Sequence, residues 1–198
     1  DNRWNQLGAD ISGVDESTAS NSAVWFGVSV ALNSDDGTIL AVGASYKDIG
    51  DDVEIGQVQV YKYDGTEWGQ RGQNLDGEAA SDVFGGSVSL NANGTILAVG
   101  AISNDNVATN AGHVRVYRYS YDTAVWVQIG EDVEGDVSEG NAESGAVVSL
   151  DSTGYILTVS APDADTYDGS VTEGGRVRRY RFYDNAWSQM GSDIVGYA

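Results

Sequence analysis

Three carboxylates fall within six residues between Pro162 and Gly169: Asp163, Asp165 and Asp168. Oxygen ligands at alternating positions of a turning loop are what Ca²⁺ uses in proteins, so this loop is a candidate calcium site. Its spacing departs from the EF-hand pattern, and the equivalent loops elsewhere in the chain have different residues. The alternative is an acidic surface loop that holds no ion.

Catalytic side chains are scarce in this sequence. His113 is the single histidine and there is no cysteine, so Cys–His pairs and histidine metal triads lack their parts. No phosphate-binding loop, nucleophile elbow or zinc-protease motif occurs. His113 stands where two matching segments have Gln57 and Arg176, and a position that varies in this way is typical of a solvated strand residue. We predict that the chain is not an enzyme.

Two other residues could contact something outside the chain. Trp25 stands where the matching segments have Val83 and Glu143, so the repeat does not account for it and we take it as a candidate ligand contact. Asn93 begins a glycosylation sequon, Asn-Gly-Thr. The same Asn-Gly pair also suits a tight turn, and the turn interpretation holds unless the host is a secreting eukaryote.

An internal repeat sets the positions of these residues. Four segments share the pattern WxQxGxxxxG and recur at intervals of about 60 residues, which indicates a repeat architecture. Three further short segments recur in each period, each rich in β-branched or aromatic residues and bounded by Gly, Asn or Asp, and these predict strands. The tryptophan segments begin at Trp4, Trp68, Trp126 and Trp187. The expected first strands are 26–32, 84–90 and 144–150, the second strands are 38–44, 95–101 and 155–161, and the third strands are 56–63, 112–119 and 175–182.

Turn residues separate the first and second strands of each repeat. They are Asp36-Gly37, Asn93-Gly94 and Thr153-Gly154. Asp-Gly and Asn-Gly favour two-residue hairpin turns in which both central residues have positive φ, so we expect tight antiparallel hairpins. No stretch keeps a 3.6-residue apolar period, and we expect no helix of consequence.

The third strands are apolar on both faces. Val58 and Val60 share one face, while Tyr61 and Tyr63 share the other. Such a sheet must be covered twice, as it is by the neighbouring blades of a propeller. The sequence therefore predicts an all-β fold of β-propeller-type blades, each of four antiparallel strands, in three repeats plus one extra strand. A β-sandwich is the alternative, but it gives no reason for the repeat.

These motifs resemble the FG-GAP repeats of integrin-α-like β-propellers. The matching residues are Phe26-Gly27 and Phe84-Gly85, followed by Val-Gly-Ala at 42–44 and 99–101. The third strands and tryptophan segments look like a variant found in secreted repeat proteins of marine microbes. The resemblance extends over essentially the whole chain and implies the blade fold and a binding role outside the cell. Integrin-type repeats often carry a DxDxDG calcium loop between the first two strands, but the loops here are too short for it, so the resemblance does not imply calcium.

The third repeat departs from the other two. An arginine at a position between blades must be paired or hydrated, so we expect this blade to face solvent or another chain. Ser144, Thr158, Ser160 and Arg179 stand where the first two repeats have Phe, Ala, Gly and Val.

The repeats predict a single array over residues 1–198, with blades near 26–77, 84–135 and 144–196 and an extra tryptophan strand at 1–13. Closed propellers have four to eight blades, and an unpaired strand is a template for association. Two chains could form a six-bladed ring, chains could join head to tail in a filament, or the sequence could belong to a longer polypeptide. We expect assembly at the edges marked by Trp4, Trp187 and Arg179.

The formal net charge is −20, from thirty acidic and ten basic residues. This charge disfavours nucleic acids and anionic membranes as partners, and no apolar run is long enough to insert into a bilayer. Seven of the ten basic residues lie on third strands, where we expect acidic partners. Our leading interpretation is an extracellular or cell-surface structural and adhesive module, which binds itself or surface proteins and has calcium as its one candidate cofactor. The alternative is a lectin-like propeller that binds glycans.

Overall fold

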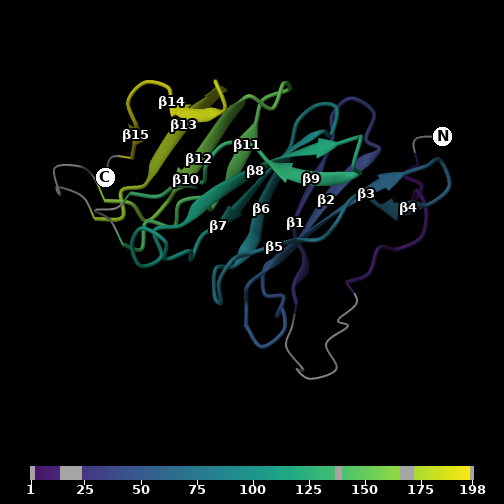
Figure 1. The fold of residues 1–198 in the computed structure, drawn as a ribbon, viewed down its shortest axis with the longest axis horizontal. Coiled ribbons are helices and arrows are strands. Elements are labelled where there is room, and N and C mark those ends of the chain that lie inside the picture. Colours follow the sequence, from purple (N-terminus) through teal and green to yellow (C-terminus); the bar gives the residue numbers. More distant parts are fainter. Residues whose placement is uncertain (1–2, 14–23, 137–139, 166–171, 197–198) are drawn as a thin grey trace.

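The computed structural model describes residues 3–13, 24–136, 140–165 and 172–196. The described residues form β-strands and no helix. The strands make three antiparallel sheets, one for each repeat. The sheets lie side by side in chain order (Figure 1). We call them blades one, two and three. The all-β fold and the blade-like repeats are therefore as the sequence predicted.

Each blade consists of three long strands and a fourth strand broken in two. In blade one, β4 and β5 both pair with β3, because the chain leaves the sheet between them. Blades two and three repeat this pairing. The strands of blade one are β1 (Phe26–Leu32), β2 (Ile39–Ala44), β3 (Gln57–Tyr63), β4 (Trp68–Gln70) and β5 (Leu75–Asp76); those of blade two are β6 (Phe84–Leu90), β7 (Ile96–Ala101), β8 (His113–Ser120), β9 (Val125–Gln128) and β10 (Val133–Glu134); those of blade three are β11 (Val148–Leu150), β12 (Ile156–Ala161), β13 (Arg176–Tyr183), β14 (Ala186–Gln189) and β15 (Ile194–Val195).

The turns between first and second strands differ from the prediction. Gly37 has a positive φ of 67°, but Asp36 does not, so the two-residue hairpin with two positive φ angles was wrong. The loop is longer and is organised by the buried side chain of Asn33, whose Oδ1 accepts a hydrogen bond from the Ile39 N–H at 2.7 Å. Asn91 bonds Ile96 in the same way in blade two. The antiparallel pairing itself was predicted correctly.

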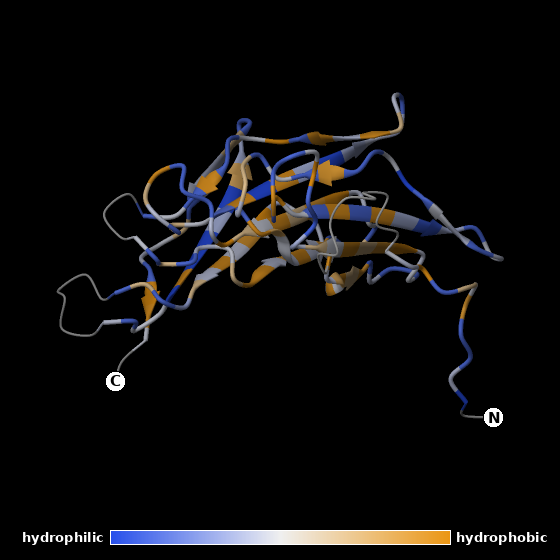
Figure 2. Cartoon of the chain, turned by 90° about the horizontal axis from the view of Figure 1, so that it is seen from below, coloured by the Kyte–Doolittle hydropathy of each residue, from blue (hydrophilic) through white to orange (hydrophobic). Residues whose placement is uncertain are grey.

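The hydrophobic core lies between the blades. One cluster joins Ile39, Val58 and Val60 of blade one to Phe84 and other residues of blade two. A second cluster joins the equivalent face of blade two to blade three. Hydrophobic residues accordingly recur along the strands where the sheets stack (Figure 2). The sheet of blade two, which lies between the other two, is covered on both faces, as its two-sided apolar pattern requires.

Two contacts hold the blades close together at each seam. The Ser29 hydroxyl donates to the Gly85 carbonyl at 2.7 Å, and Ser87 donates likewise to Gly145. A Cβ atom at Gly43 would lie only 2.1 Å from the Gly85 oxygen, so a side chain there would prevent this approach. Gly100 has the same relation to Gly145, at 2.2 Å.

A tryptophan hydrogen bond also links each fourth strand to the preceding one. The indole Nε1 of Trp126 donates to the Arg71 carbonyl at 2.9 Å, and that of Trp187 donates to the Ile129 carbonyl at 3.1 Å. Trp68 donates in the same way to Leu7, at 2.9 Å. Residues 3–13 thus follow the path of a fourth strand from a blade before blade one. They form no strand, since no described third strand lies beside them.

Candidate functional site

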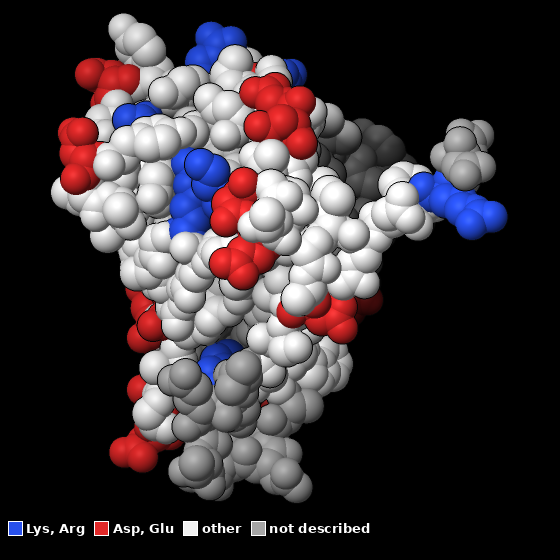
Figure 3. Space-filling view, turned by 90° about the vertical axis from the view of Figure 1, so that its right-hand side faces the viewer, with Lys and Arg blue, Asp and Glu red and all other residues white. Residues whose placement is uncertain are grey.

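Blade one has an apolar face that no other blade covers among the described residues. Val88 and Leu90 of blade two pack against the core between blades one and two. Their equivalents in blade one, Val30 and Leu32, have exposed fractions of 62% and 55%. Seen from the right-hand side of Figure 1, uncharged residues make up most of the surface, despite the net charge of −20 (Figure 3). Neighbouring apolar residues left open in this way are typical of interaction sites.

Residues 3–13 lie along the outer edge of this face. Gly8, at a positive φ of 74°, packs on the ring of Trp68, and Gly13 lies against Phe26. The Trp4 side chain is fully exposed. In each blade the corresponding tryptophan packs on a third-strand aromatic residue, with ring centroids 5.0 to 5.3 Å apart. Trp4 has no such partner among the described residues.

The opposite end of the array has changed at its seam positions. Val147 replaces the serine that donates to the next blade. Asp151 stands at the position of Asn33, whose side-chain amide donates to the Ala92 carbonyl of the next blade. Ser160 carries a Cβ where a following blade would need glycine, and Arg179 is exposed where the other blades have buried valine. Blade three therefore cannot form a seam of the type found between the other blades. Terminal repeats of solenoid proteins have outer faces adapted in this way.

The ligand candidate directly precedes β1, and the glycan candidate lies in a loop of blade two. Trp25 is 55% exposed at a positive φ of 49°, and its ring packs on Tyr46 with centroids 4.6 Å apart. Asn93 is exposed in the β6–β7 loop, where its Oδ1 accepts a hydrogen bond from the Thr95 N–H. This hydrogen bond lies within the β6–β7 loop, so the Asn93 side chain takes part in the turn.

The acidic loop provides no metal-ligating group among its described residues. Asp163 and Asp165 are both exposed, and Asp165 Oδ1 accepts a hydrogen bond from the Glu173 N–H at 2.9 Å. Asp168 lies outside the described residues. In the part of the chain that the structure describes, the one group with metal-ligating geometry is Glu78, His113 and Asp132.

Arginines on third strands bind acids across the seams, as expected from the sequence. Arg115 of blade two pairs with Glu78 of blade one and with Asp132 of its own blade. In blade three, Arg178 pairs with Asp136 of blade two at 3.0 Å and with Asp193 at 2.8 Å. Each pair of neighbouring blades is thus joined by an ion-pair cluster at the start of a third strand.

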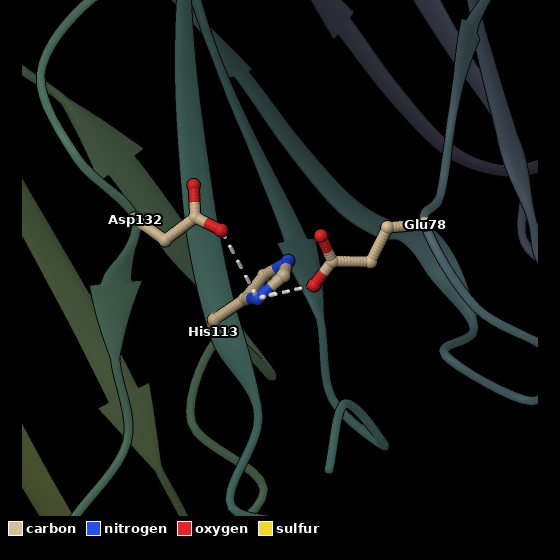
Figure 4. Close-up of side chains that lie close together, drawn as sticks. All are labelled: Glu78, His113 and Asp132. Atoms are coloured by element: carbon tan, nitrogen blue, oxygen red, sulfur yellow. Dashed lines mark ion pairs between the residues drawn. The ribbon is translucent and has the colours of Figure 1, made fainter. Parts of the chain in front are cut away.

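His113 lies inside the first of these clusters, and its prediction as a solvated residue was wrong. It is completely buried, because the Glu78 segment of blade one covers the start of β8. Its Nδ1 faces three carboxylate oxygens, at 3.7 Å (Asp132), 3.9 Å (Glu78) and 4.0 Å (Glu134). Figure 4 shows Glu78 and Asp132 approaching the imidazole from two sides. Aligning the repeats could have found these acids, since they occupy the positions of Asp136 and Asp193 in the next cluster.

Burial and charge shift the pKa values in this cluster. Burial lowers the pKa of His113 and outweighs the opposing charge of Asp132, so the imidazole is neutral near pH 7. Burial raises the pKa of Asp132, but hydrogen bonds from Arg115 and its charge bring it below its ordinary value. Two carboxylates hold the pKa of Arg115 above its ordinary value despite burial. The cluster therefore contains a neutral histidine beside the ionised Asp132.

Residues 75–117 match the family model of the FG-GAP repeat. The repeat begins in β5 of blade one and ends in β8 of blade two, so it crosses the seam and includes Glu78, His113 and Arg115. FG-GAP repeats are typical of extracellular proteins and of integrin-like binding modules. The described residues contain no helix of the length and apolar character that a membrane crossing needs.

The structure of this chain is similar in fold to that of Sqt1, and a weaker similarity to the tricorn protease was also found. Sqt1 from Chaetomium thermophilum is 15% identical with a TM-score of 0.52, over 89% of this chain and 37% of Sqt1. The tricorn protease is 13% identical with a TM-score of 0.40, over 79% of this chain and 17% of that protein. This chain thus spans little more than a third of the length of Sqt1, and the likeness shows the fold alone. The search of curated proteins found no match.

Proposed function

We propose that this chain is an extracellular protein-binding and adhesive module, not an enzyme, and that it binds through the uncovered face of blade one. The observation that carries the proposal is the contrast between the two ends of the array. Blade one keeps apolar residues, Val30 and Leu32, at positions that form a seam in blade two. Blade three has Ser160 and Arg179 at its own seam positions.

The partner that this face fits is a three-stranded antiparallel sheet. Residues 4–8 already occupy the place of a fourth strand, held by the hydrogen bond between Trp68 and Leu7. Three strands inserted beside them would complete a fourth blade, and one edge of the added sheet would hydrogen-bond to the main chain of residues 4–8. An aromatic residue on the added third strand would pack on Trp4. The added sheet would also cover Val30 and Leu32.

A second copy of this chain fits less well as the partner. Its blade three would bring the Ser160 side chain toward the Gly27 carbonyl and would place Arg179 against an apolar face. Its own fourth strand would also compete with residues 4–8 for the edge of blade one. Head-to-tail assembly is therefore an outcome for the test to exclude.

The test adds the missing strands. A copy of residues 84–125, which comprises β6 to β8 and the turn that follows, is joined directly in front of Trp4. The added strands are expected to cover Val30, to shield Trp4 from acrylamide quenching and to raise the Tm by several degrees. Trp4→Phe in the parent and in the fusion isolates the signal of this tryptophan.

Two variants control the fusion experiment. Val30→Asp in the fusion is expected to abolish both effects, because it places a charge in the new seam. Val127→Asp changes an equally accessible valine on β9, 50% exposed, and is expected to leave both effects unchanged. The proposal would be contradicted if the added strands stay sensitive to protease and the fusion has the same Tm as the parent. The average mass of the parent chain in light scattering tests the alternative. If this mass rises with concentration, and the rise is abolished by Arg179→Asp but not by Val30→Asp, the association belongs to blade three.

A further inference from the structure

The ion-pair clusters at the two seams have the same plan but different charge. In blade three, Arg176 and Arg178 lie between Asp136 and Asp193, so positive and negative charges balance. In blade two, His113 takes the place of Arg176, and Glu134 adds a third acid. Glu78, Asp132 and Glu134 then face the single charge of Arg115, which leaves a net charge of −2 around a buried imidazole.

Several atoms at the centre of this cluster have no hydrogen-bond partner. They are both ring nitrogens of His113 and Oε2 of Glu134. A buried polar atom without a partner is costly, and a native structure satisfies nearly all of them. The distances from Nδ1 to the three carboxylates, 3.7 to 4.0 Å, are too long for hydrogen bonds. Ligands that share a tetrahedral metal ion with bonds of about 2.1 Å lie about 3.4 Å apart, so small side-chain rotations would suit an ion between them.

We propose that His113, Asp132, Glu78 and Glu134 form a binding site for a first-row divalent transition metal ion, Zn²⁺ foremost. One imidazole nitrogen with carboxylate oxygens is a donor set that Zn²⁺ accepts, while Ca²⁺ and Mg²⁺ prefer oxygen alone. A dication also supplies the two positive charges that the cluster lacks. The site is distinct from the acidic loop at Asp163 and does not depend on the proposed binding function.

Arg115 binds two of the proposed ligands but leaves one of their oxygens facing His113 free of its guanidinium. It holds Oε2 of Glu78, whereas Oε1 of Glu78 faces His113. Oδ2 of Asp132 faces His113 and also accepts hydrogen bonds from Arg115, so this carboxylate would share the oxygen between Arg115 and the ion. Arg115 therefore orients the carboxylates, as groups around bound metals commonly do. An ion can reach the cluster through an adjoining surface groove of about 560 Å³, which Arg115, Asp132 and Glu134 line.

The ion would join the connection between blades one and two to blade two, because Glu78 follows β5 in that connection and the other ligands belong to blade two. Metal binding is therefore expected to raise the Tm of the full chain as well as to release heat. Calorimetry with Zn²⁺ on the metal-free chain is expected to give one ion per chain. Co²⁺ is expected to bind with the visible absorption bands of a tetrahedral site. Ca²⁺ and Mg²⁺ are expected to bind at least 100-fold more weakly than Zn²⁺.

The other two blades supply the variants. His113→Gln introduces the residue of blade one, and we expect a loss of Zn²⁺ affinity of at least 10-fold. His113→Arg introduces the residue of blade three, and we expect no Zn²⁺ binding, with a Tm that no longer responds to metal. The circular dichroism of this arginine variant should match the parent, because its guanidinium replaces part of the missing charge. Asp165→Ala is expected to bind Zn²⁺ as the parent does.

Three results would overturn the proposal. The first is absence of Zn²⁺-dependent heat and Tm change in the parent chain. The second is parental Zn²⁺ affinity in a folded His113→Gln variant. The third is loss of binding in Asp165→Ala, which would place the ion at the acidic loop.

Discussion

Gly43 and Gly100 allow each sheet to approach the next. At both positions a Cβ atom would lie 2.1 to 2.2 Å from a carbonyl oxygen of the following blade, much closer than any contact that real side chains make. The atom met first is in each case a backbone carbonyl oxygen, which can shift less easily than the end of a flexible side chain. The requirement for glycine therefore comes from the neighbouring sheet. It disappears in blade three, where Ser160 stands at the same position.

Gly100→Ala is expected to destabilise the chain by about 1–3 kcal/mol, the usual cost of overpacking a tight interior. Urea denaturation followed by tryptophan fluorescence measures the change in the free energy of unfolding. Gly69→Ala on β4 is the matched control, since a Cβ there meets nothing within 4 Å. A Gly100→Ala variant as stable as Gly69→Ala would show that the blades are not packed as closely as described.

At the scale of the element, carboxylates close the turns that join the strands. Asp64 Oδ1 accepts hydrogen bonds from the N–H groups of Thr66 and Glu67, between β3 and β4. Backbone and hydroxyl hydrogen bonds to the ionised form lower the pKa of Asp64 to about 2. Asp36 and Asp151 accept similar bonds before the second strands, and their pKa values are also lowered. The hairpins thus depend on ionised carboxylates.

This dependence fixes the pH at which the β3–β4 turn weakens. The folded pKa of Asp64 lies below its unfolded value of about 4, so its contribution to stability is complete above pH 4 and is lost as the pH falls toward 2. The carboxyl ¹³C shift of Asp64 in NMR spectra is expected to titrate with a midpoint near 2. In the double replacement Thr66→Ala with Glu67→Pro, which removes the Thr66 hydroxyl and the Glu67 N–H as donors, the midpoint should move toward 4. A midpoint near 4 in the parent would rule out the turn geometry.

For the whole molecule, the array has one end adapted to solvent and one end that is not. Blade three carries its changes at the positions that contact a following blade, and these changes prevent a further blade from docking. Blade one keeps its apolar seam residues and also holds a fourth strand for a blade that the described residues do not contain. Growth of the array is therefore directed toward a partner at blade one.

Restoring the seam of blade three is expected to create assembly at that end. The triple variant Val147→Ser, Ser160→Gly and Arg179→Val places the residues of blades one and two on the outer face of blade three. Its average mass in light scattering is expected to rise with concentration. In the assembly, the Met190 carbonyl of one copy would replace the Leu7 carbonyl as the acceptor for the Trp68 indole of the next copy. Adding Val30→Asp to the triple variant should return it to a monomer. A triple variant that stays monomeric at all concentrations would show that other features terminate the array.

The sequence alone determined the strands, their antiparallel order and the repeat, because side-chain alternation and turn residues act over a few neighbouring positions. It also indicated the unusual character of blade three through Arg179. It failed at His113, since local sequence pattern suggests exposure, whereas burial comes from Glu78 of the preceding blade, 35 residues away in the sequence. Only the tertiary structure decided which carboxylates surround that imidazole and that residues 3–13 lie beside Trp68. These contacts depend on how separate sheets stack, and that relation leaves no signal within any single strand.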